Sequence, residues 1–216
     1  MKRLLSLWAA ILLFGLGIHA QQAELKRAAL NRYKNVSTLV AQVKMTRHNA
    51  ALTQDVVSKG YFYYKKPHTE SMVFKTTKDM LLAEGSTYTM VKGGKRRVTK
   101  ANGTGNNPFE VLRDVFANLF VADGNAQLTH MATVKLQKQG NTCTMTILPH
   151  ASNNKAKRRM MYTSCVVHID MKTAEIRTLC IYEKAGNYTQ YDFSNYVLNK
   201  EVSSSVFNTQ ILINAK

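Results

Sequence analysis

The sequence predicts a mainly β (α+β) protein built as a single curved antiparallel sheet that forms an incomplete barrel, with a helical lid. Segments in which apolar and polar side chains alternate follow one another along most of the chain, and this period of two indicates half-buried strands. Short turns rich in Gly, Pro and Asn separate these segments, as expected for hairpins. Two stretches, residues 22–36 and the region after residue 107, have apolar residues at helical spacing instead.

The first twenty residues have the three parts of a secretory signal peptide. Met1-Lys2-Arg3 is basic, residues 4–18 are an apolar run, and Ala20 is a small residue before a polar sequence. The run of about fifteen residues is shorter than the roughly twenty that span a membrane. We therefore expect a signal peptide at 1–20 and an exported domain at 21–216, with an uncleaved N-terminal anchor as the alternative.

The chain is strongly basic, with 30 Lys and Arg against 13 Asp and Glu and a net charge of +17. Nucleic acid is the usual partner of such a chain, but export and the scattering of Lys and Arg along the predicted strands argue against it. The densest runs, at residues 95–97 and 155–159, lie beside predicted turns. They are either solvated hairpin ends or sites of attraction to anionic lipid or acidic partners.

Residues 54–84 form the centre of the predicted sheet. Two strands rich in Tyr, Phe and Val turn at Lys66-Pro67-His68, and a third strand follows. Gly60 interrupts the first of them, where a sheet needs to bend. Residues 37–48 are predicted as the preceding strand. Gly93-Gly94 is predicted as the turn of a further hairpin formed by residues 86–92 and 96–100.

The second helical stretch has a well-marked start. Asn107 is a cap, Pro108 occupies the first helical position and Glu110 is placed to reach back to the cap. The helix is expected to end near Asp123-Gly124. Its wide apolar stripe fits either core packing or a lid over a cavity, and consists of Phe109, Leu112, Val115, Phe116, Leu119 and Phe120.

Three cysteines in an exported protein leave at least one thiol free. A turn at residues 153–155 would place Cys143 opposite Cys165, and a turn at 172–173 would place Cys165 opposite Cys180. A disulfide Cys143–Cys165 or Cys165–Cys180 then has suitable geometry. The other interpretation is that all three are small buried apolar residues on the inner face.

The sequence contains no recognisable catalytic or metal-binding motif, and its histidines have no evident partner acid. We expect neither enzymatic activity nor a cofactor or metal.

Several short patterns in this order resemble the LolA family of periplasmic lipoprotein carriers: residues 60–67, the aromatic strand around Phe74, Leu82-x-Glu84-Gly85, Asn107-Pro108-Phe109 and the strands from Ile169 to Phe193. The resemblance covers nearly the whole chain after residue 20. It implies a half-barrel whose concave face holds the acyl chains of a lipoprotein, or another lipid, between the inner and outer membranes. It also implies a periplasmic monomer served by an inner-membrane release complex and an outer-membrane acceptor, without nucleic acid. A sensing or binding module of the same fold, without carrier activity, is the alternative.

The candidate ligand-binding residues are apolar side chains of the concave face and the lid: Leu39, Val43, Met45, Phe62, Tyr64, Met72, Phe74, Leu112, Phe116, Met145 and Ile147. The methionines suit an adaptable lining because their side chains are unbranched. Just before the proline, well-studied carriers of the family have an arginine that holds the lid shut by hydrogen bonds, and this chain has Lys66 there. Lys66 is therefore the candidate lid latch, although lysine lacks the planar fork of arginine.

Overall fold

The computed structural model describes residues 21–67, 69–101, 103, 105–120, 131–151, 153–160 and 162–210, without the side chains of 117–120, 156 and 159. The predicted signal peptide, His68 and the predicted helix end at Asp123-Gly124 lie outside the described residues. Within these residues, no helix has the length and apolar character needed to cross a membrane.

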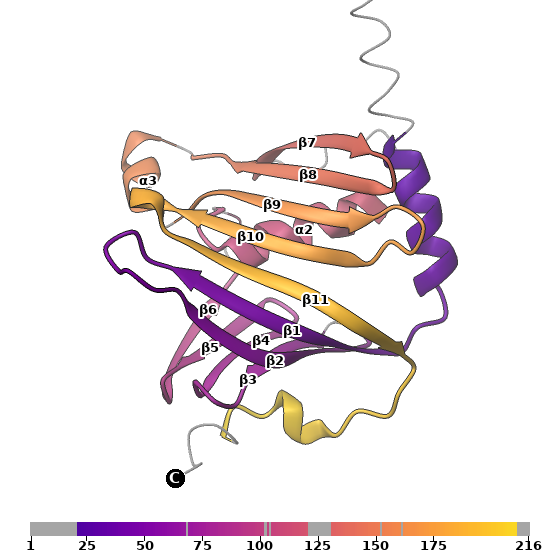
Figure 1. Cartoon of the computed structure of the whole chain (residues 1–216), viewed down its shortest axis with the longest axis horizontal. Helices are drawn as coiled ribbons and strands as arrows, with labels where there is room; N and C mark the ends of the chain where they lie inside the picture. The colour runs from indigo at the N-terminus through magenta and orange to yellow at the C-terminus, as the bar shows by residue number, and fades with distance from the viewer. Residues whose placement is uncertain are drawn as a thin grey trace, which may run out of the picture.

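Eleven strands form one sheet in which every neighbouring pair is antiparallel (Figure 1). They are β1 (Thr38–His48), β2 (Val56–Lys65), β3 (Thr69–Phe74), β4 (Asp79–Glu84), β5 (Thr87–Lys92), β6 (Lys95–Lys100), β7 (Ala132–Gln139), β8 (Thr142–Pro149), β9 (Tyr162–Asp170), β10 (Ile176–Glu183) and β11 (Tyr188–Leu198).

The sheet is open, and its strand order explains how a helix comes to cover one face. The order is β6-β5-β4-β3-β2-β1-β11-β10-β9-β8-β7, so the last strand pairs with the first in the middle of the sheet. β6 and β7 are then the two edges, and the connection from one edge to the other contains α2 (Pro108–Phe120). The prediction of an incomplete barrel with a helical lid is confirmed.

Further helical segments flank the sheet. Residues 21–33 form a helix beside the ends of β7, β8 and β9 (Figure 1), and Leu25 and Ala29 pack from it into the main core. α3 (Asn154–Arg159) lies in the connection from β8 to β9. A 3₁₀ turn, η1 (Lys184–Gly186), joins β10 to β11.

The two faces of the sheet differ in character. The concave face carries the main core, which includes buried side chains from β1, β3, β8, β9 and β10 together with Val111 and Val115 of α2. The outer face of β8 carries Thr142, Thr144 and Thr146, as the alternation predicted. This one-sided pattern is typical of antiparallel sheets.

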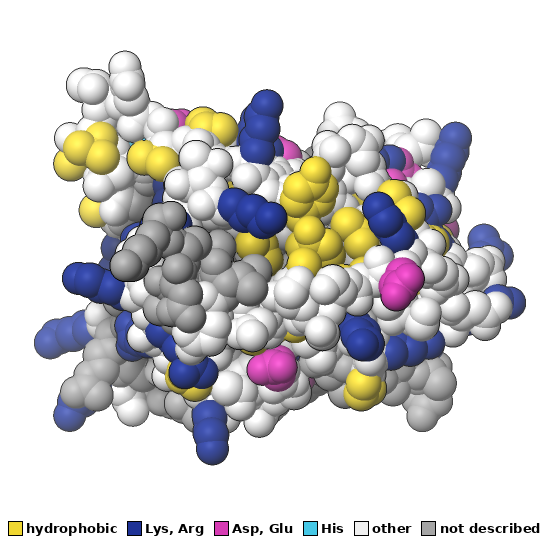
Figure 2. Space-filling view, turned by 90° about the horizontal axis from the view of Figure 1, so that it is seen from below, with side chains coloured by type: hydrophobic (Ala, Val, Ile, Leu, Met, Phe, Trp, Pro, Cys, Tyr) yellow, Lys and Arg dark blue, Asp and Glu magenta, His cyan; other side chains and the backbone are white. Residues whose placement is uncertain are grey.

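A smaller core covers part of the outer face. Val73, Met80, Leu82 and Val91 form this cluster, and Phe207 of η2 (Ser204–Phe207) packs against it. When the molecule is seen from below, apolar side chains gather in one area of its surface, with Lys and Arg side chains around them (Figure 2).

The cysteine registers differ from the prediction. Cys143 lies opposite Ile169, and Cys165 lies opposite Ile147, because α3 lengthens the connection that was expected to be a tight turn. A register shift between Ile176 and Thr178 places Cys165 opposite Ile181 and Cys180 opposite Val166.

Cys143 and Cys165 belong to the inner core, whereas Cys180 lies on the outer face. All three cysteines are free and buried, so neither predicted disulfide is present. The interpretation of the cysteines as small buried residues is confirmed, although Cys180 does not share the inner face.

Candidate functional site

An apolar cavity of about 670 Å³ lies between the concave face of the sheet and α2. Cavities of about 300–1,000 Å³ with a mostly apolar lining are typical of small-molecule sites. Aromatic side chains form much of the wall: Tyr33, Phe62, Tyr64, Tyr88, Phe109, Phe116, Phe193 and Tyr196. Aliphatic and methionine side chains complete it: Leu39, Met72, Leu81, Ala83, Leu112, Ile169, Ala174, Ile176 and Leu179.

α2 is fixed at its start by the cap that the sequence predicted. The Asn107 side chain accepts a hydrogen bond from the Phe109 N–H at 3.0 Å. Glu110 accepts one from the N–H of Gly103 at 2.7 Å, which ties the preceding loop to the helix. Val111 and Val115 are fully buried in the core. Phe109, Leu112, Arg113 and Phe116 of the same helix line the cavity.

Arg113 fastens α2 to the turn between β4 and β5. Its guanidinium donates a hydrogen bond to the carbonyl of Gly85 and lies 5.0 Å from the centre of the Tyr88 ring, a cation–π distance. Burial raises the pKa of Tyr88 to about 12, although Arg113 acts in the opposite direction. Tyr88 is therefore a neutral hydroxyl at physiological pH, and Arg113 is a permanent cation in the cavity wall.

The other end of the cavity is closed by the helix 21–33. Tyr33 donates a hydrogen bond to the carbonyl of Ala174 at 3.4 Å, and Arg32 forms an ion pair with Glu175. Tyr196 donates to the carbonyl of Ile176 at 2.6 Å, and burial raises the pKa of its hydroxyl. These tyrosine hydroxyls are thus satisfied by backbone carbonyls, which leaves their rings as the cavity surface.

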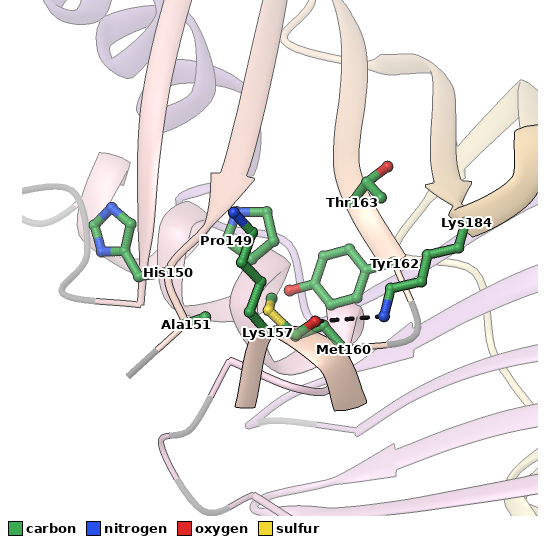
Figure 3. Close-up of a pocket in the computed structure, with 8 residues that line it drawn as sticks. All are labelled: Pro149, His150, Ala151, Lys157, Met160, Tyr162, Thr163 and Lys184. Atoms are coloured by element: carbon green, nitrogen blue, oxygen red, sulfur yellow. Dashed lines mark hydrogen bonds between the residues drawn. The ribbon is translucent and has the colours of Figure 1, made fainter. Parts of the chain in front are cut away.

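A second hollow of about 500 Å³ lies beside α3 (Figure 3). Lys184 points across it and donates to the carbonyls of Lys157 at 3.3 Å and Arg158 at 2.6 Å. The Tyr162 hydroxyl donates to the carbonyl of Gly105 at 2.8 Å. Because these polar groups hold the end of α3 and the loop before α2, we interpret this hollow as structural.

One histidine has a partner acid that the sequence analysis missed. The β1–β2 hairpin brings Asp55 to 2.7 Å from Nδ1 of His48, whose ring stacks on Tyr188 at 4.8 Å. Neither His48 nor Asp55 lines the cavity. Among the described residues, no cluster of His, Cys, Asp and Glu has the geometry of a metal site.

The family model described as outer membrane lipoprotein carrier protein LolA matches residues 34–210. The chain belongs to the LolA family. This match spans the sheet from its first strand to its last, together with α2 and the C-terminal segment.

Solved structures show similarity at low sequence identity. A putative outer membrane lipoprotein-sorting protein domain from Vibrio parahaemolyticus has 12% identity and a TM-score of 0.42, over 87% of this chain and 97% of that one. A LolA superfamily protein from Nitrosomonas europaea has 10% identity and a TM-score of 0.42, over 88% and 98%. Lipoprotein LppX from Mycobacterium tuberculosis has 15% identity and a TM-score of 0.41, over 85% and 97%. No curated protein matches the sequence.

In this LolA-family chain, six of the eleven candidate ligand-binding residues line the cavity: Leu39, Phe62, Tyr64, Met72, Leu112 and Phe116. The other five pack in the core without lining it: Val43, Met45, Phe74, Met145 and Ile147. Phe74 and Phe109 both contact Tyr191, at ring-centre distances of 6.4 and 6.3 Å. These aromatic contacts fill the concave face where Phe74 lies.

Several lining residues were not among the candidates, notably Tyr33, Leu81, Tyr88, Arg113 and Tyr196. Leu81 and Tyr88 could have been found by continuing the alternation of Met72 through the next two strands, since Met72 pairs with Leu81 and Ala83 pairs with Tyr88. Nothing in the sequence indicated that the helix 21–33 would close the cavity with Tyr33.

Lys66, the candidate latch, lies at the turn between β2 and β3. Its ammonium group donates to the carbonyl of Lys34, just after the helix 21–33, at 3.5 Å. In the described structure, the contact that joins α2 to a strand turn is made by Arg113 instead. A latching role for Lys66 stays a prediction.

Proposed function

We propose that this protein is a periplasmic carrier that binds the acyl chains of a lipoprotein, or another lipid, in the cavity under α2 and moves them from the inner to the outer membrane. The observation that carries the proposal is the apolar cavity of about 670 Å³ enclosed by the concave face of a LolA-family sheet. Membership in a family described as lipoprotein carriers supports the same class of ligand.

The cavity wall suits an acyl chain because it presents many apolar surfaces and few polar groups. Each buried methylene contributes about 0.8 kcal/mol, so even part of a long chain would bind with useful affinity. The lining is more aromatic than the sequence analysis expected, and methionine contributes Met72 to it. Aromatic rings supply large contact areas with few rotatable bonds.

The structure also suggests how the ligand would enter. Arg113 and Gly85 join α2 to the β4–β5 turn through a side-chain contact at a half-exposed position. We propose that α2 moves away from the sheet when this contact breaks, and that Lys66 acts from the β2–β3 turn, which lies at the same end of the sheet as Gly85 and contacts the carbonyl of Lys34.

The proposal extends to the whole chain. We propose a signal peptide at 1–20 and a single domain at 21–216 that acts as a monomer in the periplasm. Its partners would be the acylated cargo, an inner-membrane release complex and an outer-membrane acceptor, with no role for nucleic acid and no enzymatic step.

Binding of a fluorescent triacylated lipopeptide to residues 21–216 tests the proposed site. Leu112→Asn places a polar group in the cavity wall and Ala83→Phe fills the cavity, so each should weaken binding by about tenfold or more, the effect of losing about two methylene contacts. Leu148→Asn is the matched control because Leu148 is 37% exposed and does not line the cavity. Circular dichroism checks that each variant is folded.

Equal affinities for the wild type and the folded Ala83→Phe variant would contradict the proposed site. Carrier activity is a separate question, which transfer of the lipopeptide between two vesicle populations answers. A protein that binds the lipopeptide but does not accelerate transfer would be a binding or sensing module instead of a carrier.

A further inference from the structure

The edge strand β6 places a cation beside the cavity. Arg97 pairs with Met90, and Thr99 pairs with Tyr88, which lines the cavity. Met90 in turn pairs with Leu81, another lining residue. Because paired residues project to the same face of a sheet, Arg97 lies on the cavity side of β6.

The neighbouring residue, Arg96, lies on the other side of the same strand. It pairs with Val91, which belongs to the smaller core on the outer face. Arg96 and Arg97 are both exposed. The strand therefore carries two similar arginines, of which one faces the cavity and the other faces away.

Arg113 adds a second cation at this end of the cavity. It lines the cavity and lies over Tyr88, which is two residues from Met90 and on the same face of β5. A guanidinium has five N–H donors, and the carbonyl of Gly85 accepts from Nη1. Arg113 therefore combines a permanent charge with several donor groups in a mostly apolar wall.

Two carboxylates in the same region oppose the positive charge of these arginines. Glu70 lines the cavity, whereas Glu110 is buried and accepts a hydrogen bond from Gly103. Against them stand Arg113 and the two basic residues on the cavity side of β6, Lys95 and Arg97. Cations prevail at the rim formed by β6.

We propose that the ligand is an amphiphile with an anionic head group, a carboxylate or a phosphate. Arg97 and Arg113 hold the head group beside β5 and β6 while the acyl chain occupies the cavity. This inference rests on the proposed acyl binding and adds the charge of the head group. Guanidinium groups bind such anions through charge-assisted paired hydrogen bonds. This arrangement keeps the charged head group at the rim of the cavity, in contact with water and with the two guanidinium groups.

The test compares two ligands with the same acyl chain, oleate and the neutral monooleoylglycerol, both below their aggregation concentrations. The wild type should prefer oleate. Arg97→Gln should weaken oleate binding by about threefold to fivefold, the range for a solvent-exposed charge pair, and leave monooleoylglycerol binding unchanged. Arg113→Gln should also reduce the preference for oleate, and Arg96→Gln is the matched control that should change neither affinity.

Ionic strength and free phosphate provide two further readouts. The preference for oleate should shrink when salt is raised from about 50 mM to about 500 mM, because exposed charges are screened over a shorter distance. Inorganic phosphate alone should compete weakly, since it lacks the acyl chain. Phosphate binding as tight as that of oleate would indicate a site for free anions and overturn the proposal.

The outcomes separate this inference from the proposed function. If the wild type binds neither ligand, acyl binding itself is wrong. If it binds both ligands equally, or if Arg97→Gln and Arg96→Gln have the same effect on oleate, the cavity binds acyl chains but the head-group site is wrong.

Discussion

Gly60 allows two strands to approach closely at the centre of the sheet. A Cβ atom at this position would lie 2.2 Å from the carbonyl oxygen of Val73 and 2.7 Å from the Phe74 ring. The absence of a side chain therefore makes room for Phe74, which is 3% exposed in the main core. The structure thus gives Gly60 a steric role, and the bend that the sequence indicates there stays a prediction.

Gly60→Ala should destabilise the protein by about 1–3 kcal/mol, because the new methyl group forces β2 and β3 apart. Ser58→Ala, on the same strand, should not lower the free energy of unfolding. The Ser58 hydroxyl is buried without a hydrogen-bond partner among the described residues, so its removal should leave stability unchanged or raise it by about 1 kcal/mol. Urea unfolding measures both, and equal losses in the two variants would refute the steric argument.

The cysteines are buried thiols with little reactivity. Burial raises the pKa of Cys165 to about 12 and also raises the pKa values of Cys143 and Cys180. The reactive thiolate is therefore scarce near neutral pH.

The native protein should react with the thiol reagent DTNB far more slowly than the urea-unfolded protein. All three thiols of the unfolded protein should react, which releases three equivalents of thionitrobenzoate. Release of a single equivalent after unfolding would reveal a disulfide and contradict the structure.

At the scale of elements, the helix 21–33 contributes both to the core and to the cavity. Leu25 is fully buried, whereas Leu30 on the same helix is 48% exposed. Ion pairs of Glu24 with Lys138 and of Arg32 with Glu175 join the helix to β7 and to the β9–β10 turn. The Glu24–Lys138 pair is exposed and contributes at most about 1 kcal/mol, whereas Glu175 of the other pair is buried.

Leu25→Ala should reduce the free energy of unfolding by about 2–5 kcal/mol, the cost of a cavity in a packed core. Leu30→Ala should change it by less than about 0.5 kcal/mol. Thermal or urea unfolding of residues 21–216 checks the pair. Similar small effects would show that the helix does not pack on the sheet as described.

Alternation along β1 and β2 was enough to predict which face of these strands is apolar, and it assigned Leu39, Phe62 and Tyr64 to the cavity wall. It could not predict how far the cavity extends, because Val43 and Phe74 share that face but are covered by other side chains. Those side chains come from segments that are distant in the sequence.

Hairpin registers were a second limit. The prediction for Cys143 and Cys165 assumed a tight turn, whereas α3 occupies the connection, and the prediction for Cys180 did not include the shift after Ile176. A shift of one residue moves a side chain to the other face. Cys180 therefore lies on the outer face.

At the scale of the whole molecule, the strand order links the open edges to the cavity. The chain reaches one edge at β6, crosses the concave face as α2 and returns to the other edge at β7. The helix over the cavity is thus part of the crossover itself. Because α2 is anchored by Val111 and Val115 at one side and by Arg113 at a half-exposed contact, the Arg113 contact is where we expect opening to begin.

Native mass spectrometry of the protein shows whether the cavity holds an acyl chain. The protein is purified from the periplasm without detergent, and its mass is recorded before and after addition of a lipopeptide. The account predicts bound acyl species that the lipopeptide displaces, and less of them in the folded Ala83→Phe variant. A protein that is empty and also fails to bind the added lipopeptide would contradict the account.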